Sequence, residues 1–145
     1  MKDPYKAFRK SIYDALNGNI TFDSGPVNIW DEKAEDETND TYILLSQQTS
    51  TPIPNFNGFF SSMSLILQII VKTQDTVSKD SIDDISDQVM QILLPTPTTN
   101  GLIQQPGFNI NCVTIASANS VDLNLNPTGS DIKKLLRISA KIAES

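Results

Sequence analysis

The feature that most constrains the fold is an alternation of apolar side chains between Ser62 and Gln74. Side chains two residues apart lie on the same face of a β-strand. One face of this segment would be wholly apolar, with Met63, Leu65, Leu67, Ile69 and Val71. The other face would be mixed, with Ser64, Gln68 and Lys72 beside Ile66 and Ile70. The pattern predicts a central strand that is covered fully on one side and partly on the other.

An amphipathic helix is expected near the start of the sequence. Asp3 is a suitable N-cap, Pro4 suits the first helical position, and Gly18 would end the helix. One apolar stripe with helical spacing lies between these signals, made of Tyr5, Phe8, Ile12 and Leu16. Such a helix needs a partner surface for its stripe, because an isolated helix of this length is marginal in water.

A second helix is expected after the central strand. Ser81 and Asp84 fit a capping box, and further aspartates crowd the first turns, where the helix dipole favours negative charge. Pro95 would end this helix, and Pro95–Gly107 reads as a loop. The buried stripe of the helix would be Ile82, Ile85, Val89 and Leu93.

Further strands are predicted on both sides of the second helix. Pro26–Trp30 and Thr41–Gln48 precede it, and Phe108–Ala118 follows, with an alternating extension that reads as an edge. Ile132–Glu144 has the composition of a helix, and a C-terminal amphipathic helix is the alternative there. Its two-residue alternation favours a strand, with one face formed by Leu136, Ile138, Ala140 and Ile142.

These elements predict one α+β domain over residues 1–145. The expected order is α-β-β-β-α-β-β, with an antiparallel or mixed sheet of about four to five strands and both helices packed on one face. A chain of 145 residues can bury a core of its own without disulfides.

An acidic segment lies between two of the predicted strands. Residues 31–40 hold one lysine and six acids, which are Asp31, Glu32, Glu35, Asp36, Glu37 and Asp40. A divalent metal site would need these carboxylates in a fixed constellation, which a flexible polar stretch does not provide. A solvated hairpin loop is the favoured interpretation. A surface that repels an anion is the alternative.

Catalytic chemistry is sparse in this sequence. Histidine is absent, and no G-x-S-x-G elbow or glycine-rich phosphate loop is present. The only cysteine, Cys112, stands in an alternating apolar run and is expected to be a buried small hydrophobe. We therefore expect a protein that is not an enzyme and that uses no metal or cofactor.

The net charge of −6 disfavours binding of nucleic acid through its phosphates, but not the passage of DNA past the protein. The first 20 residues lack the apolar core of a secretory signal, and the longest apolar run, Met63–Val71, is about half a membrane span. We expect a soluble protein that is cytosolic or assembled in a cytosol, with no membrane partner.

The loop Thr49–Phe60 is rich in proline and phenylalanine. Aromatic side chains on a long hairpin tip often mark a protein interface. We therefore expect an inter-subunit or partner interface there, with Pro52, Ile53, Pro54, Phe56 and Phe59 as its candidate residues. The alternative is that Phe59 and Phe60 simply begin the core of the next strand.

The whole layout resembles the tail-terminator (tail-completion, head–tail joining) proteins of tailed bacteriophages. The opening helix YKAFRKSIYDALNGN, the long strand SLILQIIVKTQ, the second helix SIDDISDQVMQILLP and the closing strand LLRISAKIAES each resemble an element of that family. PVNIWDEKAEDETNDTYILLSQ resembles its short strand, polar turn and following strand. The resemblance rests on the type and order of elements and covers nearly the whole chain. The Thr49–Phe60 loop and the long stretch around Val121 depart from the family pattern.

The resemblance implies a structural virion protein. Family members form rings, typically hexamers, that cap the tail tube and dock to the connector under the capsid, with DNA passing through the lumen. It implies localisation in the virion tail or neck, and in the host cytoplasm during assembly. The acidic residues of 31–40 would then be candidates for a loop near the DNA lumen.

Two alternatives stay open from the sequence. A head–tail adaptor or ring protein of a short-tailed phage neck would form a twelve-fold ring instead. A small cytosolic module could bind a peptide at a sheet edge, with the polar run SVDLNLN as that edge.

Overall fold

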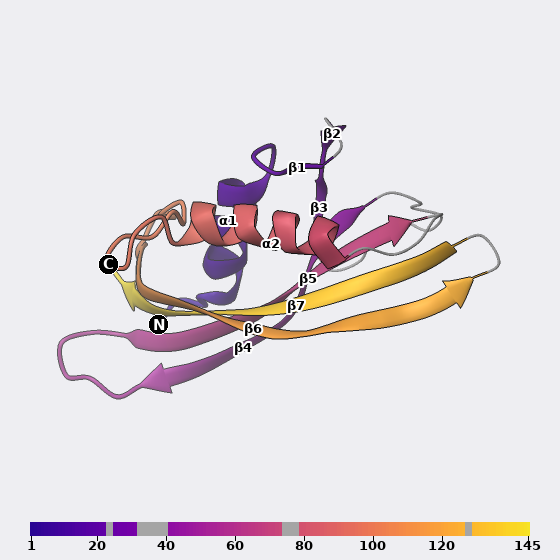
Figure 1. Ribbon diagram of the computed structural model, residues 1–145. Coiled ribbons are helices and arrows are strands. Elements are labelled where there is room, and N and C mark those ends of the chain that lie inside the picture. The colour runs from indigo at the N-terminus through magenta and orange to yellow at the C-terminus, as the bar shows by residue number, and fades with distance from the viewer. Residues whose placement is uncertain (23–24, 32–40, 74–78, 127–128) are drawn as a thin grey trace.

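The computed structural model describes residues 1–22, 25–31, 41–73, 79–126 and 129–145 (Figure 1). It has two helices and seven strands within these residues. In chain order they are α1 (Tyr5–Leu16), β1 (Thr21–Phe22), β2 (Gly25–Pro26), β3 (Asn28–Asp31), β4 (Tyr42–Ile53), β5 (Phe60–Thr73), α2 (Lys79–Leu93), β6 (Phe108–Asn126) and β7 (Gly129–Glu144).

Five strands form one sheet, in the order β3-β4-β5-β7-β6. β3 runs parallel to β4, whereas every other neighbouring pair in this sheet is antiparallel. β1 and β2 form a separate two-stranded antiparallel sheet. The predicted α+β class with a mixed sheet is confirmed, and the predicted element order needs only these two short strands in addition.

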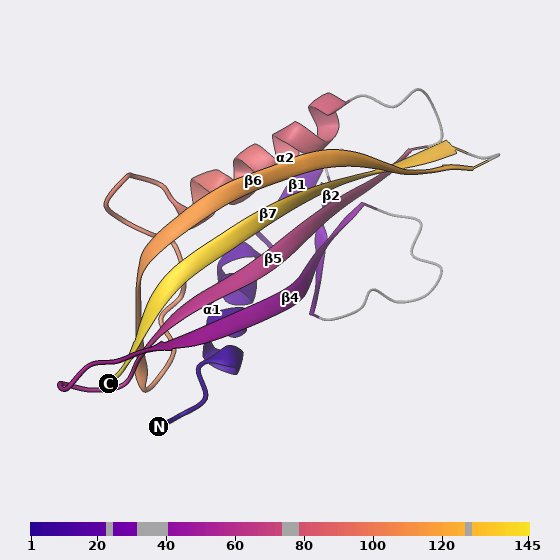
Figure 2. The ribbon, with the colours of Figure 1, turned by 90° about the horizontal axis from the view of Figure 1, so that it is seen from below.

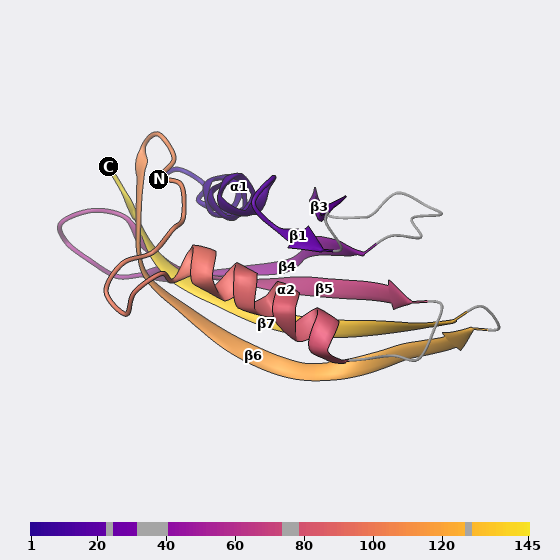
Figure 3. The ribbon, with the colours of Figure 1, turned by 45° about the horizontal axis from the view of Figure 1, so that its top comes forward.

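Both helices pack on the same face of the sheet (Figures 1 and 3). α1 contacts β3, β4 and β5, while α2 contacts β5 and β7. The predicted apolar face of β5 is fully buried beneath them, from Met63 to Val71. Since burying one large apolar side chain stabilises a fold by about 1.5–3 kcal/mol, this interface contributes strongly to the stability. Neither α1 nor α2 covers the opposite face of the sheet (Figure 2).

The opening helix follows its predicted stripe with one exception. Phe8, Ile12 and Leu16 are completely buried, but Tyr5 is 37% exposed. The N-cap prediction is off by one position, because Pro4 occupies the N-cap and the Asp3 carboxylate instead accepts a hydrogen bond from the Tyr5 backbone N–H. Gly18 ends the helix as expected, with a φ of +81° that favours glycine.

The second helix begins two residues earlier than its capping signal. It starts at Lys79, so Ser81 lies inside the first turn and is not the N-cap that the sequence predicted. The predicted stripe is confirmed in full, since Ile82, Ile85, Val89 and Leu93 have no exposed surface. The capping-box aspartate, Asp84, lies beyond the first turn of this helix, where the effect of the helix dipole has fallen off.

The last segment is a strand, as its alternation predicted. β7 lies between β5 and β6 in the sheet, and Leu136, Ile138, Ala140 and Ile142 face the helices. A strand pairs on both sides here, whereas a C-terminal helix would have left the long edge of β5 open.

The edge strand β6 corrects the expectation for Cys112. Its pairing with β7 shifts register in three places, the first between Asn111 and Thr114. Cys112 lies in this irregularity with a φ of +53°, and it is exposed. The two-residue alternation predicted burial wrongly, because a bulge changes the face on which the following side chains lie.

Candidate functional site

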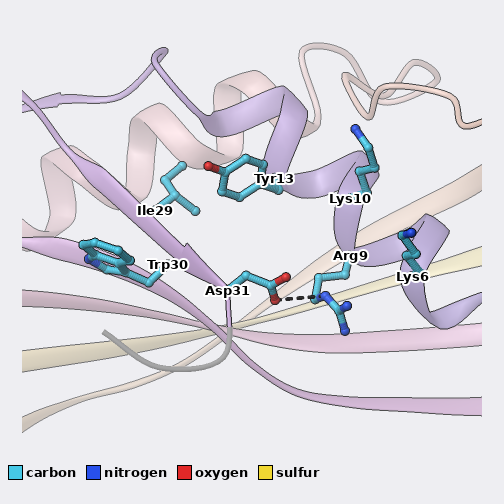
Figure 4. A pocket seen from close by; sticks show the side chains of 7 residues that line it. All are labelled: Lys6, Arg9, Lys10, Tyr13, Ile29, Trp30 and Asp31. Atoms are coloured by element: carbon cyan, nitrogen blue, oxygen red, sulfur yellow. Dashed lines mark ion pairs between the residues drawn. The ribbon is translucent and has the colours of Figure 1, made fainter. Parts of the chain in front are cut away.

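A pocket of about 410 Å³ opens between α1 and the edge strand β3. Its lining is drawn in Figure 4 and comprises Lys6, Arg9, Lys10, Tyr13, Ile29, Trp30 and Asp31. Four of these side chains come from α1 and three are consecutive in β3. The helix and the strand are close to each other both in sequence and in space. The pocket is therefore a local feature of the first 31 residues.

The helical repeat explains why α1 contributes its cations together. Lys6, Arg9 and Lys10 are spaced by three and one residues, and Tyr13 follows Arg9 by four, so all four lie on one flank. The opposite flank carries the stripe that enters the core. The pocket therefore lies on the solvent-exposed flank of α1, while the other flank packs on the sheet.

Two of the three cations already have partners. The Arg9 Nε atom lies 2.9 Å from Asp31 Oδ1, the contact drawn in Figure 4. Lys10 Nζ lies 2.8 Å from Asp14 Oδ2, one helical turn away. Within the described residues, the Lys6 ammonium group forms no ion pair and donates no hydrogen bond. Counting the described residues alone, the flank therefore keeps an excess of positive charge, although the protein as a whole is acidic.

The Lys10 contact also affects the acidity of its partner. The hydrogen bond from the Lys10 ammonium lowers the pKa of Asp14, partial burial opposes this, and Gln105 adds a second lowering hydrogen bond. Gln105 Nε2 lies 3.4 Å from the same carboxylate oxygen. Asp14 is thus held ionised, and it neutralises part of the charge of Lys10.

The pocket also has aromatic surface with an unused donor. Trp30 Nε1 is buried and finds no hydrogen-bond partner within the described part of the chain. Tyr13 is half-buried against the core. Cations beside aromatic rings can bind carboxylates and apolar surface together, as they do in protein interfaces.

The described residues hold no group of three or more acidic, histidine or cysteine side chains that could bind a metal ion. None of the helices in that part of the chain is long and apolar enough to span a membrane.

The five residues predicted as an interface lie together at one end of the sheet. Pro52 and Ile53 end β4, while Pro54, Phe56 and Phe59 belong to the turn before β5. Phe56 is fully exposed and Phe59 is 53% exposed. This hairpin protrudes past the rest of the sheet, beside the C-terminus (Figures 1 and 2). Its exposure fits an interface, which stays a prediction.

Of the six acids predicted near a lumen, the structure describes only Asp31. It is exposed at the end of β3 and is bound to Arg9. Glu32, Glu35, Asp36, Glu37 and Asp40 lie outside the described residues. The hairpin interpretation of this segment is wrong, because β3 and β4 are parallel and a hairpin joins antiparallel strands.

The cationic flank of α1 was not predicted as a site. The spacing of its lysines and arginine was visible in the sequence. What the sequence did not show is that β3 would pair in parallel at the edge of the sheet and so place Trp30 and Asp31 against that flank.

No protein-family model matches this sequence, and no curated protein matches it. Among solved structures, 17 chains match. One of them is a chain from the virion of a native gene transfer agent particle, with a TM-score of 0.62 and 12% sequence identity. The match covers 97% of this chain and 99% of that chain. At this identity the two proteins share a fold over their whole lengths.

Proposed function

We propose that the protein is a non-enzymatic structural component of a tailed-phage virion. It forms a ring at the tail end or neck, terminates the tail and joins it to the head connector. The observation that carries this proposal is the full-length fold match to a chain of a gene transfer agent virion. Localisation in the virion, and in the host cytoplasm during assembly, follows from that role.

The distribution of free surface supports a protein that binds copies and neighbours. β3 pairs only with Tyr42–Leu45 of β4, so within the described residues the remainder of β4 forms an open edge. The β4–β5 and β6–β7 hairpins extend from opposite ends of the sheet (Figure 2). Open edges and protruding hairpins are surfaces through which subunits commonly pair.

Passage of DNA through the ring requires a lumen that does not hold phosphate. A net charge of −6 suits this requirement, because phosphate binding depends on lysine and arginine. The acidic residues of 31–40 are the candidate lumen loop. Tail-tube and connector proteins would be the permanent partners, and DNA a transient one.

A peptide-binding module receives less support from β6. Its pairing with β7 is interrupted by three register shifts. Bulges twist an edge away from regular pairing, so this edge is a poor template for an added strand.

Native mass spectrometry and negative-stain imaging, with and without phage tail tubes, test the proposal. We expect a hexameric ring, either free or seated on the end of the tube. A twelve-fold ring would identify a head–tail adaptor of the neck instead. A protein that stays monomeric at high concentration and does not bind tail tubes would contradict the proposal.

A further inference from the structure

We propose that neighbouring copies in the ring contact each other through two oppositely charged flanks. The α1/β3 pocket of one copy receives the acidic outer flank of α2 of the next copy. This inference rests on the proposed ring and specifies which surfaces close it.

The first surface is the cationic flank of α1 described above. It combines the ammonium group of Lys6, which has no partner among the described residues, with Lys10 and with the aromatic surface of Tyr13 and Trp30 (Figure 4). Such a pocket favours carboxylates that have apolar side chains beside them. Within the described residues of the same chain, the only acids that pair with the cations of this flank are Asp14, bound to Lys10, and Asp31, bound to Arg9.

The second surface is the exposed side of α2, where Asp83, Asp84 and Asp87 lie close together. Asp83 pairs with Lys134 of β7 at 2.9 Å, and Asp87 accepts a hydrogen bond from Gln91. Asp84 has no partner within the described residues. Half-buried Met90 follows Asp87 by three residues, so an apolar side chain stands beside the acids.

The two surfaces lie on opposite sides of the molecule. The pocket adjoins β3, the first strand in the sheet order, whereas Asp83 binds to β7 near the other edge. The side of α2 nearer α1 is marked by Gln88, which exchanges two hydrogen bonds with Thr21. Asp83 and Asp87, which are one helical turn apart, therefore face away from α1, whereas Asp84 lies one turn before Gln88, on the side nearer α1.

Complementary surfaces on opposite sides of one subunit produce head-to-tail contacts. Such contacts are heterologous and generate a closed ring when the rotation between copies closes. A two-fold dimer would instead require both flanks on one face. The arrangement is the one expected of a subunit that repeats around an axis.

Charge reversal of each flank tests this contact in the full chain. Lys6→Glu with Lys10→Glu reverses the first flank, and Asp84→Lys with Asp87→Lys reverses the second. Both pairs leave the Arg9–Asp31 and Asp83–Lys134 ion pairs intact, whereas Lys10→Glu removes the Lys10–Asp14 pair. Lys133→Glu with Lys141→Glu is the matched control, because it changes net charge as the first variant does but lies on the uncovered face of the sheet.

Native mass spectrometry and light scattering measure assembly at low and high salt. We expect each reversed variant alone to assemble only at concentrations about tenfold or more above those at which wild type assembles. The reason is that like charges then face each other across the contact. Mixing the two reversed variants should restore assembly, with the subunits alternating and therefore even in number. Wild-type assembly should weaken as salt rises.

The outcomes separate this contact from the ring itself. Suppose that wild type forms rings. If both reversed variants then assemble as well as wild type, or if the mixture of the two folded variants does not recover assembly, the proposed contact is wrong and the ring proposal stands. An equal defect in the control would also overturn the contact. A wild type that never assembles overturns both proposals. Should a reversal unfold the chain, the neutral pairs Lys6→Gln with Lys10→Gln and Asp84→Asn with Asp87→Asn must each weaken assembly and its salt dependence.

Discussion

The Nε atom of Arg9 in α1 lies 2.9 Å from Oδ1 of Asp31, the last residue of β3. This ion pair joins the opening helix to the edge strand and forms one wall of the pocket. The side chains retain 30% and 43% of their exposure, so solvent screens the attraction.

Replacing Asp31 by Asn should therefore lower the free energy of unfolding by less than about 1 kcal/mol. Urea denaturation at low ionic strength measures the loss. In high salt the difference from wild type should shrink, because screening already weakens the pair. A loss of several kcal/mol at either ionic strength would mean that this contact holds β3 in place, contrary to our expectation.

The central strand should show a strong contrast between its two faces. Leu67 has no exposed surface and faces the helices, so Leu67→Ala should cost about 2–5 kcal/mol of unfolding free energy through lost contacts and a cavity. Ile66 is half-buried on the uncovered face, and Ile66→Ala should cost about 1 kcal/mol. Urea denaturation of dilute protein compares the two. Equal losses would contradict the one-sided covering of the sheet.

Periodicity predicted those parts of the fold in which each residue's face depends only on its neighbours in sequence. The alternation of β5 and β7 and the stripe of α2 are of this kind, and all three were confirmed. The stripe needs no knowledge of the partner surface, because a helix that must bury Ile82, Ile85, Val89 and Leu93 can do so in one orientation only.

The features that sequence missed depend on pairing between distant segments. Cys112 became exposed through a register shift against β7, and Asp31 reached Arg9 because β3 pairs with β4 in parallel. Neither register is encoded in the alternation itself. The same limit applies to the pocket. The sequence showed the spacing of the cations on α1, but it did not show that β3 would lie against them.

Gly101 should tolerate no side chain. Its backbone N–H donates a 2.9 Å hydrogen bond to the Leu93 carbonyl at the end of α2, and an added Cβ would collide with the Ile92 carbonyl oxygen. Gly101→Ala should thus lower the unfolding free energy by about 1–3 kcal/mol. Thermal unfolding measures it against Gly25→Ala, whose Cβ would meet Phe22 O at an ordinary 3.7 Å. Similar melting temperatures for the two variants would contradict this packing.

Acid should weaken the contribution of Asp14. Hydrogen bonds from Lys10 and Gln105 lower its pKa below the usual 3.8, so folding favours the ionised carboxylate. A lowered pKa gives stability that is complete above the unfolded-state value and disappears as pH falls through the folded-state value. The stability difference between wild type and Asp14→Asn should be constant above about pH 5 and diminish below it, by urea denaturation across a pH series. A difference that grows on acidification would contradict the sign of this pKa shift.

The tip of the β4–β5 hairpin should matter for assembly and not for folding. Phe56 is fully exposed, so Phe56→Ala should change the unfolding free energy by no more than about 0.5 kcal/mol. If the hairpin docks to a neighbouring copy or to the tail tube, the same substitution should weaken that binding about tenfold or more, since aromatic anchors dominate interfaces. Co-sedimentation with tail tubes and native mass spectrometry measure the two kinds of binding separately. Ile103→Ala is the matched control, because Ile103 is exposed in the loop after α2 and outside the hairpin. Wild-type binding by Phe56→Ala in both assays would remove the hairpin tip from the interface.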